Sequence, residues 1–340
     1  MQKFLDWLER VLTPLAKVIG ENKYLVAIRD GFLLSTPLLI VGSVFLLIAN
    51  FPLPQWDTWM SHLLGKDWAT MMSVPASASF DVMTILAVVG IAYSLGKQFN
   101  VDAMQAGIIA LVSFFIVTPY QTLFTPENSS KVYEVTSLPL KWMGSSGLFL
   151  GMIVALIATR LFVAIVRKGW TIKMPEGVPP TVVKSFEALI PSFLVVTLMF
   201  LVNWLAALTP YGNLQDVIFE FLQTPLLSLG NTLGAMSIAY LFLHFFWFFG
   251  INGGSVVGAV FNPVLRALSV ENLQAFKDGH EIPNIITGQF QDMFATFGGA
   301  GSTLSLIIVM VLFCKSQRIK KLSQLSLIPG VFVINEPIIF

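Results

Sequence analysis

The sequence is poor in charge. Asp, Glu, Lys and Arg together make up 11% of the 340 residues, and the formal net charge is only +1. A soluble domain carries about 25% charged residues, and nucleic-acid-binding domains are usually strongly basic. The shortage of charge therefore excludes water as the main solvent of this chain, and we expect no nucleic-acid partner.

Chemically specialised residues are also scarce. The single cysteine, Cys314, excludes an internal disulfide and leaves the redox compartment open. It lies at the end of an apolar segment, where we interpret it as a small buried hydrophobic residue. The sequence contains no phosphate-binding loop, nucleotide fingerprint or metal-ligand cluster. We therefore expect no metal and no other cofactor.

Long apolar stretches are abundant. Five of them lack Asp, Glu, Lys and Arg: 31–56, 103–126, 188–215, 221–265 and 293–314. About 20 apolar residues in a helix cross the hydrocarbon core of a bilayer, and only helices or closed barrels satisfy their backbone there. The sequence therefore predicts an all-α polytopic membrane protein. The expected spans are 31–51, 71–96, 103–119, 147–166, 186–208, 233–251 and 301–314.

Basic residues gather at alternate ends of these spans. They are Lys17, Lys23, Arg29, Lys97, Arg167, Lys168, Lys173, Lys315, Arg318, Lys320 and Lys321. The positive-inside rule places all of them in the cytoplasm and makes the N-terminus cytoplasmic. Residues 1–28 have apolar side chains at helical spacing with charges between them. They predict an amphipathic helix, which either lies in the membrane interface or packs on the protein's cytoplasmic face, and not a cleavable signal.

The second half of the chain is less regular than the first. To keep the basic residues inside, the chain must cross outward somewhere in 252–300, a stretch interrupted by Gly, Asn and Pro. Irregular backbone at membrane depth is tolerated around a cavity or within protein. We therefore expect a regular N-terminal bundle over 29–168, a cytoplasmic Pro-rich linker over 169–185, and a C-terminal bundle over 186–340 with broken helices and re-entrant hairpins.

Three charged residues lie inside apolar surroundings. Glu336, in the last stretch GVFVINEPIIF, is predicted to lie at the tip of a re-entrant hairpin. A charge at that depth costs several kcal/mol unless it is paired, protonated or wetted. Glu336 therefore either faces a polar ligand in a cavity or is a structural carboxylate bonded to a neighbouring helix. Asp81 and Arg160, in the second and fourth spans, are expected to pair across helices.

Motifs in five places resemble the membrane subunit, enzyme IIC, of the lactose/cellobiose/diacetylchitobiose branch of the bacterial sugar phosphotransferase system. The motifs are GFLLSTPLLIVGSVFLLIANFP (31–52), MPEGVPPTVVKSFEALIP (174–191), WFFGINGG (247–254), GGAGSTL (298–304) and NEPIIF (335–340). The resemblance extends from about residue 5 to the end of the chain. Each motif alone is weak, but their order and spacing are specific.

The resemblance implies a homodimeric permease of the bacterial inner membrane that binds and translocates a β-linked disaccharide of the cellobiose, diacetylchitobiose or lactose class. The N-terminal bundle would carry the dimer contact and the C-terminal bundle the sugar. A separate soluble IIB subunit, phosphorylated on its own cysteine, would phosphorylate the C6 hydroxyl of the sugar. Cys314 is not that cysteine, because a membrane-embedded thiol would be out of the donor's reach.

The resemblance also indicates the site residues. Glu336 matches the family's motif acid and is expected to hydrogen-bond the C6 hydroxyl and assist its deprotonation. Asn335 either binds sugar hydroxyls or caps the backbone of the hairpin. Trp247 is the preferred stacking platform for a pyranose ring. The GGAGSTL motif, with Gly299 and Thr303, either lets the backbone approach the sugar or serves close helix packing.

The sequence departs from the family pattern in two places. Asn252 stands where the family usually has histidine in GIHG; an amide binds a hydroxyl but does not shuttle a proton near neutral pH. His244 either compensates for it or is a hydrogen-bonded core residue. The chain also ends at Phe340, where family members usually continue, so we expect an incomplete C-terminal bundle. An ion-coupled secondary sugar carrier and a truncated sugar-binding remnant without transport are therefore kept as alternative functions.

Overall fold

The computed structural model describes Val18, Ile338 and residues 21–51, 53–125, 131–248 and 253–331. The predicted N-terminal amphipathic helix lies almost wholly outside the described residues. Two compact units are present, one formed by Ala27–Pro225 and the other by Met1–Val26 with Leu226–Phe340. We call them the first and the second unit, and each is described separately.

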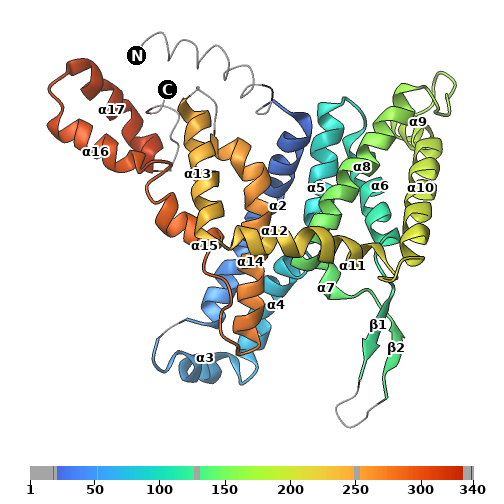
Figure 1. Ribbon diagram of the computed structural model, residues 1–340, viewed down its shortest axis with the longest axis horizontal. Helices are drawn as coiled ribbons and strands as arrows, with labels where there is room; N and C mark the ends of the chain where they lie inside the picture. Colours follow the sequence, from blue (N-terminus) through green and yellow to red (C-terminus); the bar gives the residue numbers. More distant parts are fainter. Residues whose placement is uncertain are drawn as a thin grey trace. The chain divides into compact units, whose positions relative to one another are not determined.

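The first unit consists of helices and one β-hairpin (Figure 1). Its helices are α2 (Lys23–Ala49), α3 (Trp56–Leu64), α4 (Trp68–Phe80), α5 (Met83–Gln98), α6 (Ala103–Ile116), α7 (Leu140–Met143), α8 (Leu148–Arg167), α9 (Pro180–Glu187), α10 (Leu189–Ala207) and α11 (Leu214–Ile218). A short 3₁₀ turn (Ser145–Gly147) precedes α8, and a π-helical turn (Phe219–Gln223) follows α11. The all-α prediction is therefore confirmed apart from the hairpin.

The β-hairpin lies between the predicted third and fourth spans. Strands β1 (Gln121–Phe124) and β2 (Tyr133–Thr136) pair antiparallel, with Gln121 opposite Thr136. Both strands project away from the helices in Figure 1, and all eight residues are exposed. Aromatic and β-branched residues favour strands, and this short signal was hidden by the helical pattern of the flanking segments.

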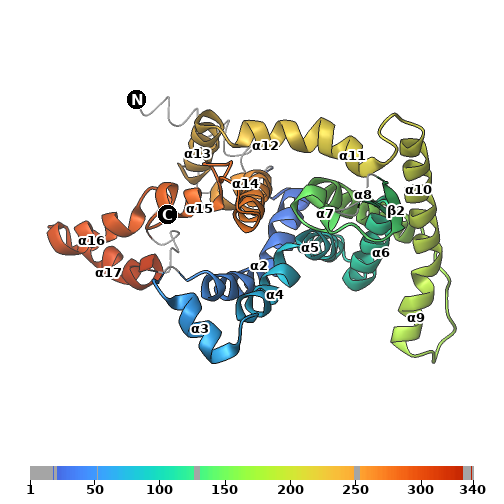
Figure 2. The same cartoon turned by 90° about the horizontal axis from the view of Figure 1, so that it is seen from below.

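The core of the first unit is built on close helix contacts at small residues. Helices α5, α6 and α8 lie side by side in both ribbon views (Figures 1 and 2). A Cβ atom at Gly90 of α5 would lie 2.6 Å from the carbonyl oxygen of Gly31 in α2. One at Gly151 of α8 would lie 2.7 Å from a methyl carbon of Thr84. Small residues allow such backbone approach, which is how helices associate in a bilayer.

Within the described residues, four helical segments are long and apolar enough to cross a membrane. They are Lys23–Ala49, Trp68–Gln98, Ser145–Arg167 and Pro180–Ala207, and they correspond to the first, second, fourth and fifth predicted spans. The sixth span corresponds to a broken pair, Leu214–Gly230 and Leu233–Phe248, bent by 83°. The predicted third and seventh spans form the shorter apolar helices α6 and α16 (Thr303–Phe313).

The boundary between the units differs from the predicted one. Helix α10 packs on α6 and α8, and α11 packs on α8, so residues 186–225 lie with the first unit. The linker helix α9 is attached to the same unit, because Lys184 Nζ lies 3.2 Å from Asp102 Oδ2 at the start of α6. The prolines and glycines of 169–185 thus interrupt the helix without separating two bodies.

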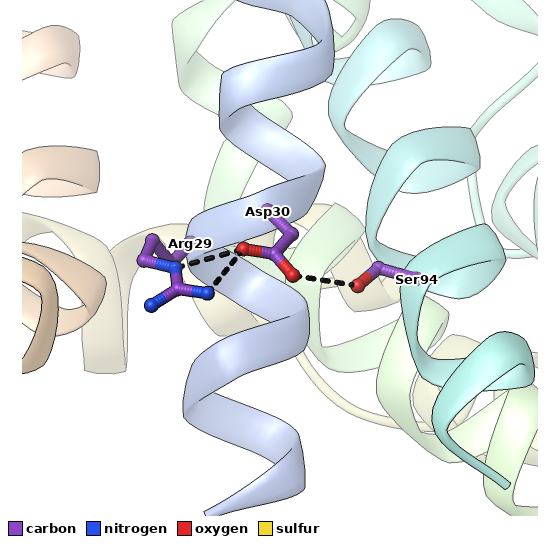
Figure 3. A network of polar contacts seen from close by, with 3 residues as sticks. All are labelled: Arg29, Asp30 and Ser94. Atoms are coloured by element: carbon purple, nitrogen blue, oxygen red, sulfur yellow. Dashed lines mark hydrogen bonds and ion pairs between the residues drawn. The ribbon is translucent and has the colours of Figure 1, made fainter. Parts of the chain in front are cut away.

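Polar contacts in the first unit also correct the expected pairing of Asp81 with Arg160. Asp81 follows α4, just before α5 begins, whereas the Arg160 guanidinium carbon lies 5.4 Å from the ring centroid of Phe99, just after α5 ends. The 16 residues of α5 separate these ends by about 24 Å, so no Asp81–Arg160 pair forms. A different network joins α2 to α5: Arg29 Nε donates to Asp30 Oδ1 at 2.7 Å, and Ser94 Oγ donates to Asp30 Oδ2 at 3.5 Å (Figure 3).

The second unit contains helices joined by irregular turns. They are α12 (Thr224–Gly230), α13 (Leu233–Phe248), α14 (Gly253–Lys277), α15 (Gly288–Phe290), a π-helical turn (Gln291–Ala295), α16 and α17 (Gln317–Val331). Helix α13 packs on α14 and α16 on α17 (Figure 1). The prediction that the second half of the chain is broken and irregular is confirmed.

An asparagine network fixes the loop between α14 and α15. Asn284 Oδ1 accepts from Asn231 Nδ2 at 2.8 Å, and Asn284 Nδ2 donates to Glu271 Oε2 at 3.0 Å. The backbone of Asn284 is held twice by the side chain of Asn272, at 2.9 and 2.8 Å. These bonds tie the loop both to α14 and to the break between α12 and α13, where Asn231 lies.

Candidate functional site

Helix α13 carries two of the predicted site residues, His244 and Trp247. His244 and Trp247 are three residues apart and therefore share one face of the helix. Trp247 is 6% exposed and packs with Leu243 of the same helix and with Ala300. The indole is thus held against the 298–302 segment, which the sequence identified as the glycine-rich motif GGAGSTL.

The glycine-rich motif forms a tight turn at the start of α16. Gly298, Gly299, Gly301 and Ser302 all have positive φ, at 69°, 99°, 73° and 56°. Glycine adopts this conformation at little cost, so these residue types explain the turn. Thr303 Oγ1 donates to the Gly298 carbonyl at 3.3 Å, and Ser302 N donates to the Gly299 carbonyl at 2.9 Å. Thr303 therefore closes the turn, and its side chain is 5% exposed.

His244 faces this turn. A Cβ atom at Gly301 would lie 3.6 Å from His244 Cε1, so the imidazole edge lies beside the backbone of the motif. The structure therefore brings His244 and Trp247 together with the GGAGSTL turn. The turn begins 51 residues after Trp247 in the sequence. A neutral histidine carries one donor and one acceptor nitrogen, which suits a hydroxyl-rich ligand at this position.

Sequence reasoning missed Tyr240. Its ring centroid lies 6.2 Å from that of His244, and its side chain packs against the cluster of Leu243, Trp247 and Ala300. The available signal was the spacing of Tyr240, His244 and Trp247, which recur at i, i+4 and i+7 and therefore form one stripe of a helix. The stripe combines two aromatic faces with an imidazole, an arrangement typical of carbohydrate sites.

Asn252, Asn335 and Glu336 lie outside the described residues. Gly253, which follows Asn252, is so close to α13 that a Cβ atom there would lie 3.0 Å from Trp247 Cδ1. Gly330, near the end of α17, lies close to Ile307 of α16, since a Cβ atom there would lie 2.5 Å from Ile307 Cδ1.

The described residues hold no group of three or more His, Cys, Asp and Glu side chains able to bind a metal. Cys314, which the sequence placed in the core, is partly exposed at the end of α16. The candidate site therefore contains hydrogen-bonding side chains, aromatic rings and a backbone turn. These groups suit recognition of a neutral polar molecule.

Comparison with known proteins agrees with this description. A family model for the phosphotransferase system EIIC matches residues 29–340. The cellobiose-specific EIIC component of Geobacillus stearothermophilus is 38% identical over all of this chain and 76% of its own length. The lichenan permease IIC component of Bacillus subtilis (strain 168) is 40% identical over all of this chain and 75% of its own length.

A solved structure is similar over nearly the whole chain. The crystal structure of the transporter ChbC, the IIC component from the N,N'-diacetylchitobiose-specific phosphotransferase system, has a TM-score of 0.93 and 41% sequence identity. The match covers 98% of this chain and 78% of that one. The motifs, the helical membrane fold and these comparisons lead to one conclusion: the chain belongs to the EIIC family of the phosphotransferase system.

Proposed function

We propose that this chain binds a β-linked disaccharide of the cellobiose or diacetylchitobiose class and carries it across the bacterial inner membrane for phosphorylation. The observation that carries the proposal is the similarity at 38–41% identity to proteins named for cellobiose, lichenan and diacetylchitobiose. Relatives named for lactose are 28–29% identical, so lactose is the weaker candidate.

The sugar site that we propose lies in the second unit. In this proposal the indole of Trp247, 6% exposed in this structure, packs against the C–H bonds of a pyranose ring while the sugar hydroxyls reach polar groups. His244 and the backbone of the GGAGSTL turn, including Gly299 and Thr303, lie beside it. Asn252, Asn335 and Glu336 complete the site in this proposal, with the two amides binding hydroxyls.

Glu336 is proposed to act on the C6 hydroxyl. The hydroxyl oxygen attacks the phosphorus of the phosphocysteine on a IIB subunit, the P–S bond breaks, the thiolate leaves, and the hydroxyl proton passes to the Glu336 carboxylate. Some relatives are named EIICB components, which supports a IIB partner for this family. A homodimer and a cytoplasmic N-terminus are parts of the same proposal, the latter because of the basic clusters.

Equilibrium binding to the purified chain tests the proposal. We expect saturable binding of radiolabelled cellobiose or diacetylchitobiose that Glu336→Gln weakens about tenfold, because a buried charged hydrogen bond is lost. Glu281→Gln removes an exposed acid of the same unit and serves as the matched control, with unchanged affinity. Adding phosphorylated IIB is expected to give sugar 6-phosphate with the native chain alone.

Two outcomes would contradict the proposal. If none of the sugars binds saturably, the substrate class is wrong. If Glu336→Gln and Glu281→Gln bind as the native chain does, Glu336 has a structural role. Uptake that follows an ion gradient and needs no IIB would instead favour the secondary-carrier alternative.

A further inference from the structure

Two arginines of α8 converge on a single aromatic ring. The guanidinium carbon of Arg160 lies 5.4 Å from the ring centroid of Phe99, and that of Arg167 lies 5.2 Å from it. Residues seven apart face the same side of a helix, so the two side chains reach the ring from one stripe of α8. Both arginines are exposed, and their charges therefore act at one place on the surface of the first unit.

These charges are not neutralised by acids of the described chain. Within the described residues, neither guanidinium lies within salt-bridge distance of a carboxylate. The acid closest in sequence to the ring, Asp102, is already engaged: its Oδ1 accepts from Gln105 N at 3.0 Å, and its Oδ2 lies 3.2 Å from Lys184 Nζ. The patch formed by Arg160, Arg167 and Phe99 thus keeps its positive charge.

Its depth in the membrane follows from the geometry of α8. Trp170, 54% exposed just beyond the helix, carries the Lys168 ammonium 5.3 Å from its ring, and exposed tryptophans of this kind lie at the membrane interface. Arg167 therefore lies near the headgroups. Arg160 begins about 10 Å deeper along the helix, in a segment that has the hydropathy of a membrane span.

We propose that Arg160 and Arg167, which both contact Phe99, bind the phosphodiester of an anionic phospholipid. An arginine at this depth extends toward the interface, and two planar guanidinium groups match the oxygens of a phosphate. Of their N–H groups, the structure assigns one to a protein acceptor, where Arg167 Nη2 donates to the Phe99 carbonyl at 3.1 Å. The acyl chains would lie against the exposed Ile157 on the same helix.

The bilayer explains Arg160 better than a soluble partner does. Capping the end of α5 accounts for Arg167, which bonds the Phe99 carbonyl, but not for Arg160, one to two turns deeper. A soluble protein such as IIB would not reach a side chain rooted in the hydrocarbon region, whereas lipid phosphates are present at its edge. The leaflet, but not the site, depends on the orientation proposed above.

The test uses the full chain, purified and delipidated in detergent. Phosphatidylglycerol, phosphatidylcholine with the same acyl chains, or inorganic phosphate is added, and bound lipid is counted by native mass spectrometry while the unfolding temperature is followed. We expect the native chain to retain phosphatidylglycerol preferentially and Arg160→Gln to lower this affinity about fivefold. Lys173→Gln removes an exposed cation of the same predicted face and should leave it unchanged.

The possible outcomes separate the explanations. Equal retention of phosphatidylglycerol by the native chain and Arg160→Gln, or equal losses in Arg160→Gln and Lys173→Gln, would overturn the proposal. Stabilisation by inorganic phosphate as strong as that by phosphatidylglycerol would show a general anion site and would overturn the lipid assignment. Sugar binding is measured on the same samples, so failure of this proposal is distinguishable from failure of the proposed function.

Discussion

Both units pack helices closely at glycines, such as Gly90 in the first and Gly330 in the second, but glycines with positive φ serve a different purpose in part of the second unit. In the first unit, Gly31, Gly90 and Gly151 lie inside helices, where the missing side chain lets backbones touch. The first unit's glycines with positive φ, at 65, 169, 177 and 212, lie in turns where a Cβ atom would meet nothing within 4 Å. In the second unit, the glycines with positive φ at 298, 299 and 301 form a turn that packs against Trp247 and His244.

The difference separates a scaffold from a binding element. Helix-to-helix contact at glycine fixes the positions of whole helices, and a substitution there disturbs the fold. A turn whose residues have positive φ exposes backbone groups. Its glycines lose more conformational entropy on folding than other residues do. The first unit thus gains rigidity from its glycines, and the second gains a shaped surface. The following substitutions test this division.

Gly90→Ala should have the largest effect. The new Cβ would lie 2.6 Å from the Gly31 carbonyl oxygen, a backbone atom that cannot rotate away, and overpacking of this kind costs about 2–3 kcal/mol of the free energy of unfolding. Gly234→Ala is the matched control, because a Cβ atom there meets nothing within 4 Å and alanine favours a helix by up to about 1 kcal/mol. Unfolding in sodium dodecyl sulfate measures both.

The sugar affinity of Gly90→Ala and Gly234→Ala gives a second comparison of the two units. Chain that remains folded in Gly90→Ala should bind sugar as the native chain does, because the proposed site lies in the other unit. Equal stability of Gly90→Ala and Gly234→Ala would show that the contact of α2 with α5 does not hold the scaffold together.

Asn284→Ala should have an intermediate effect, confined to the second unit. It leaves Asn231 Nδ2 and Glu271 Oε2 without the partners they have at 2.8 and 3.0 Å, which costs about 2 kcal/mol for partly buried groups. We expect faster hydrogen exchange at the amide of Ile286, which donates to Asn231 Oδ1 at 3.1 Å.

Asn50→Ala is the control for this change, since Asn50 Nδ2 makes one exposed bond, to the Leu46 carbonyl. It should change stability by less than about 0.5 kcal/mol. If exchange in Asn284→Ala rises equally in both units, the network supports the whole fold and the division between the units is not as we describe it.

Sequence patterns predicted the broad organisation well because hydropathy acts residue by residue. Long charge-free stretches gave the helices, and Gly and Pro marked the irregular second half. The unit boundary could not be read in this way, because α10 is as apolar as any span and only its packing on α6 and α8 assigns it to the first unit. Composition reports that a helix is buried, not which neighbour buries it.

Which candidate site residues lie together could be anticipated near a motif and not elsewhere. His244, Trp247 and the GGAGSTL turn meet in the structure as a single group, whereas Tyr240 carried only the weak signal of helical spacing. The Asp81–Arg160 pair failed for a geometric reason: Asp81 lies between α4 and α5 and Arg160 lies in α8, so the two residues are near opposite ends of α5. Two charges in a membrane need partners, and their spacing along the sequence does not identify them.

Lys184→Gln should have the smallest effect and a defined pH dependence. A hydrogen bond from the Gln105 backbone N–H and the nearby Lys184 ammonium hold the pKa of Asp102 below its ordinary value. The ionised form is therefore stabilised in the folded state, and this stability is present above the ordinary pKa and is lost as the pH falls through the lowered pKa. Because the Lys184 side chain is 62% exposed, its share is below about 1 kcal/mol.

The native chain should thus be slightly more stable than Lys184→Gln at pH 7, and the difference should vanish at an acidic pH below the lowered pKa of Asp102, where Asp102 is protonated in both proteins. Unfolding midpoints at the two pH values measure it, with Lys173→Gln as a control that removes a cation without a described carboxylate partner. A difference that persists unchanged at low pH would mean that Lys184 acts through packing of α9. The linker helix would then be attached to the first unit by apolar contacts rather than by charge.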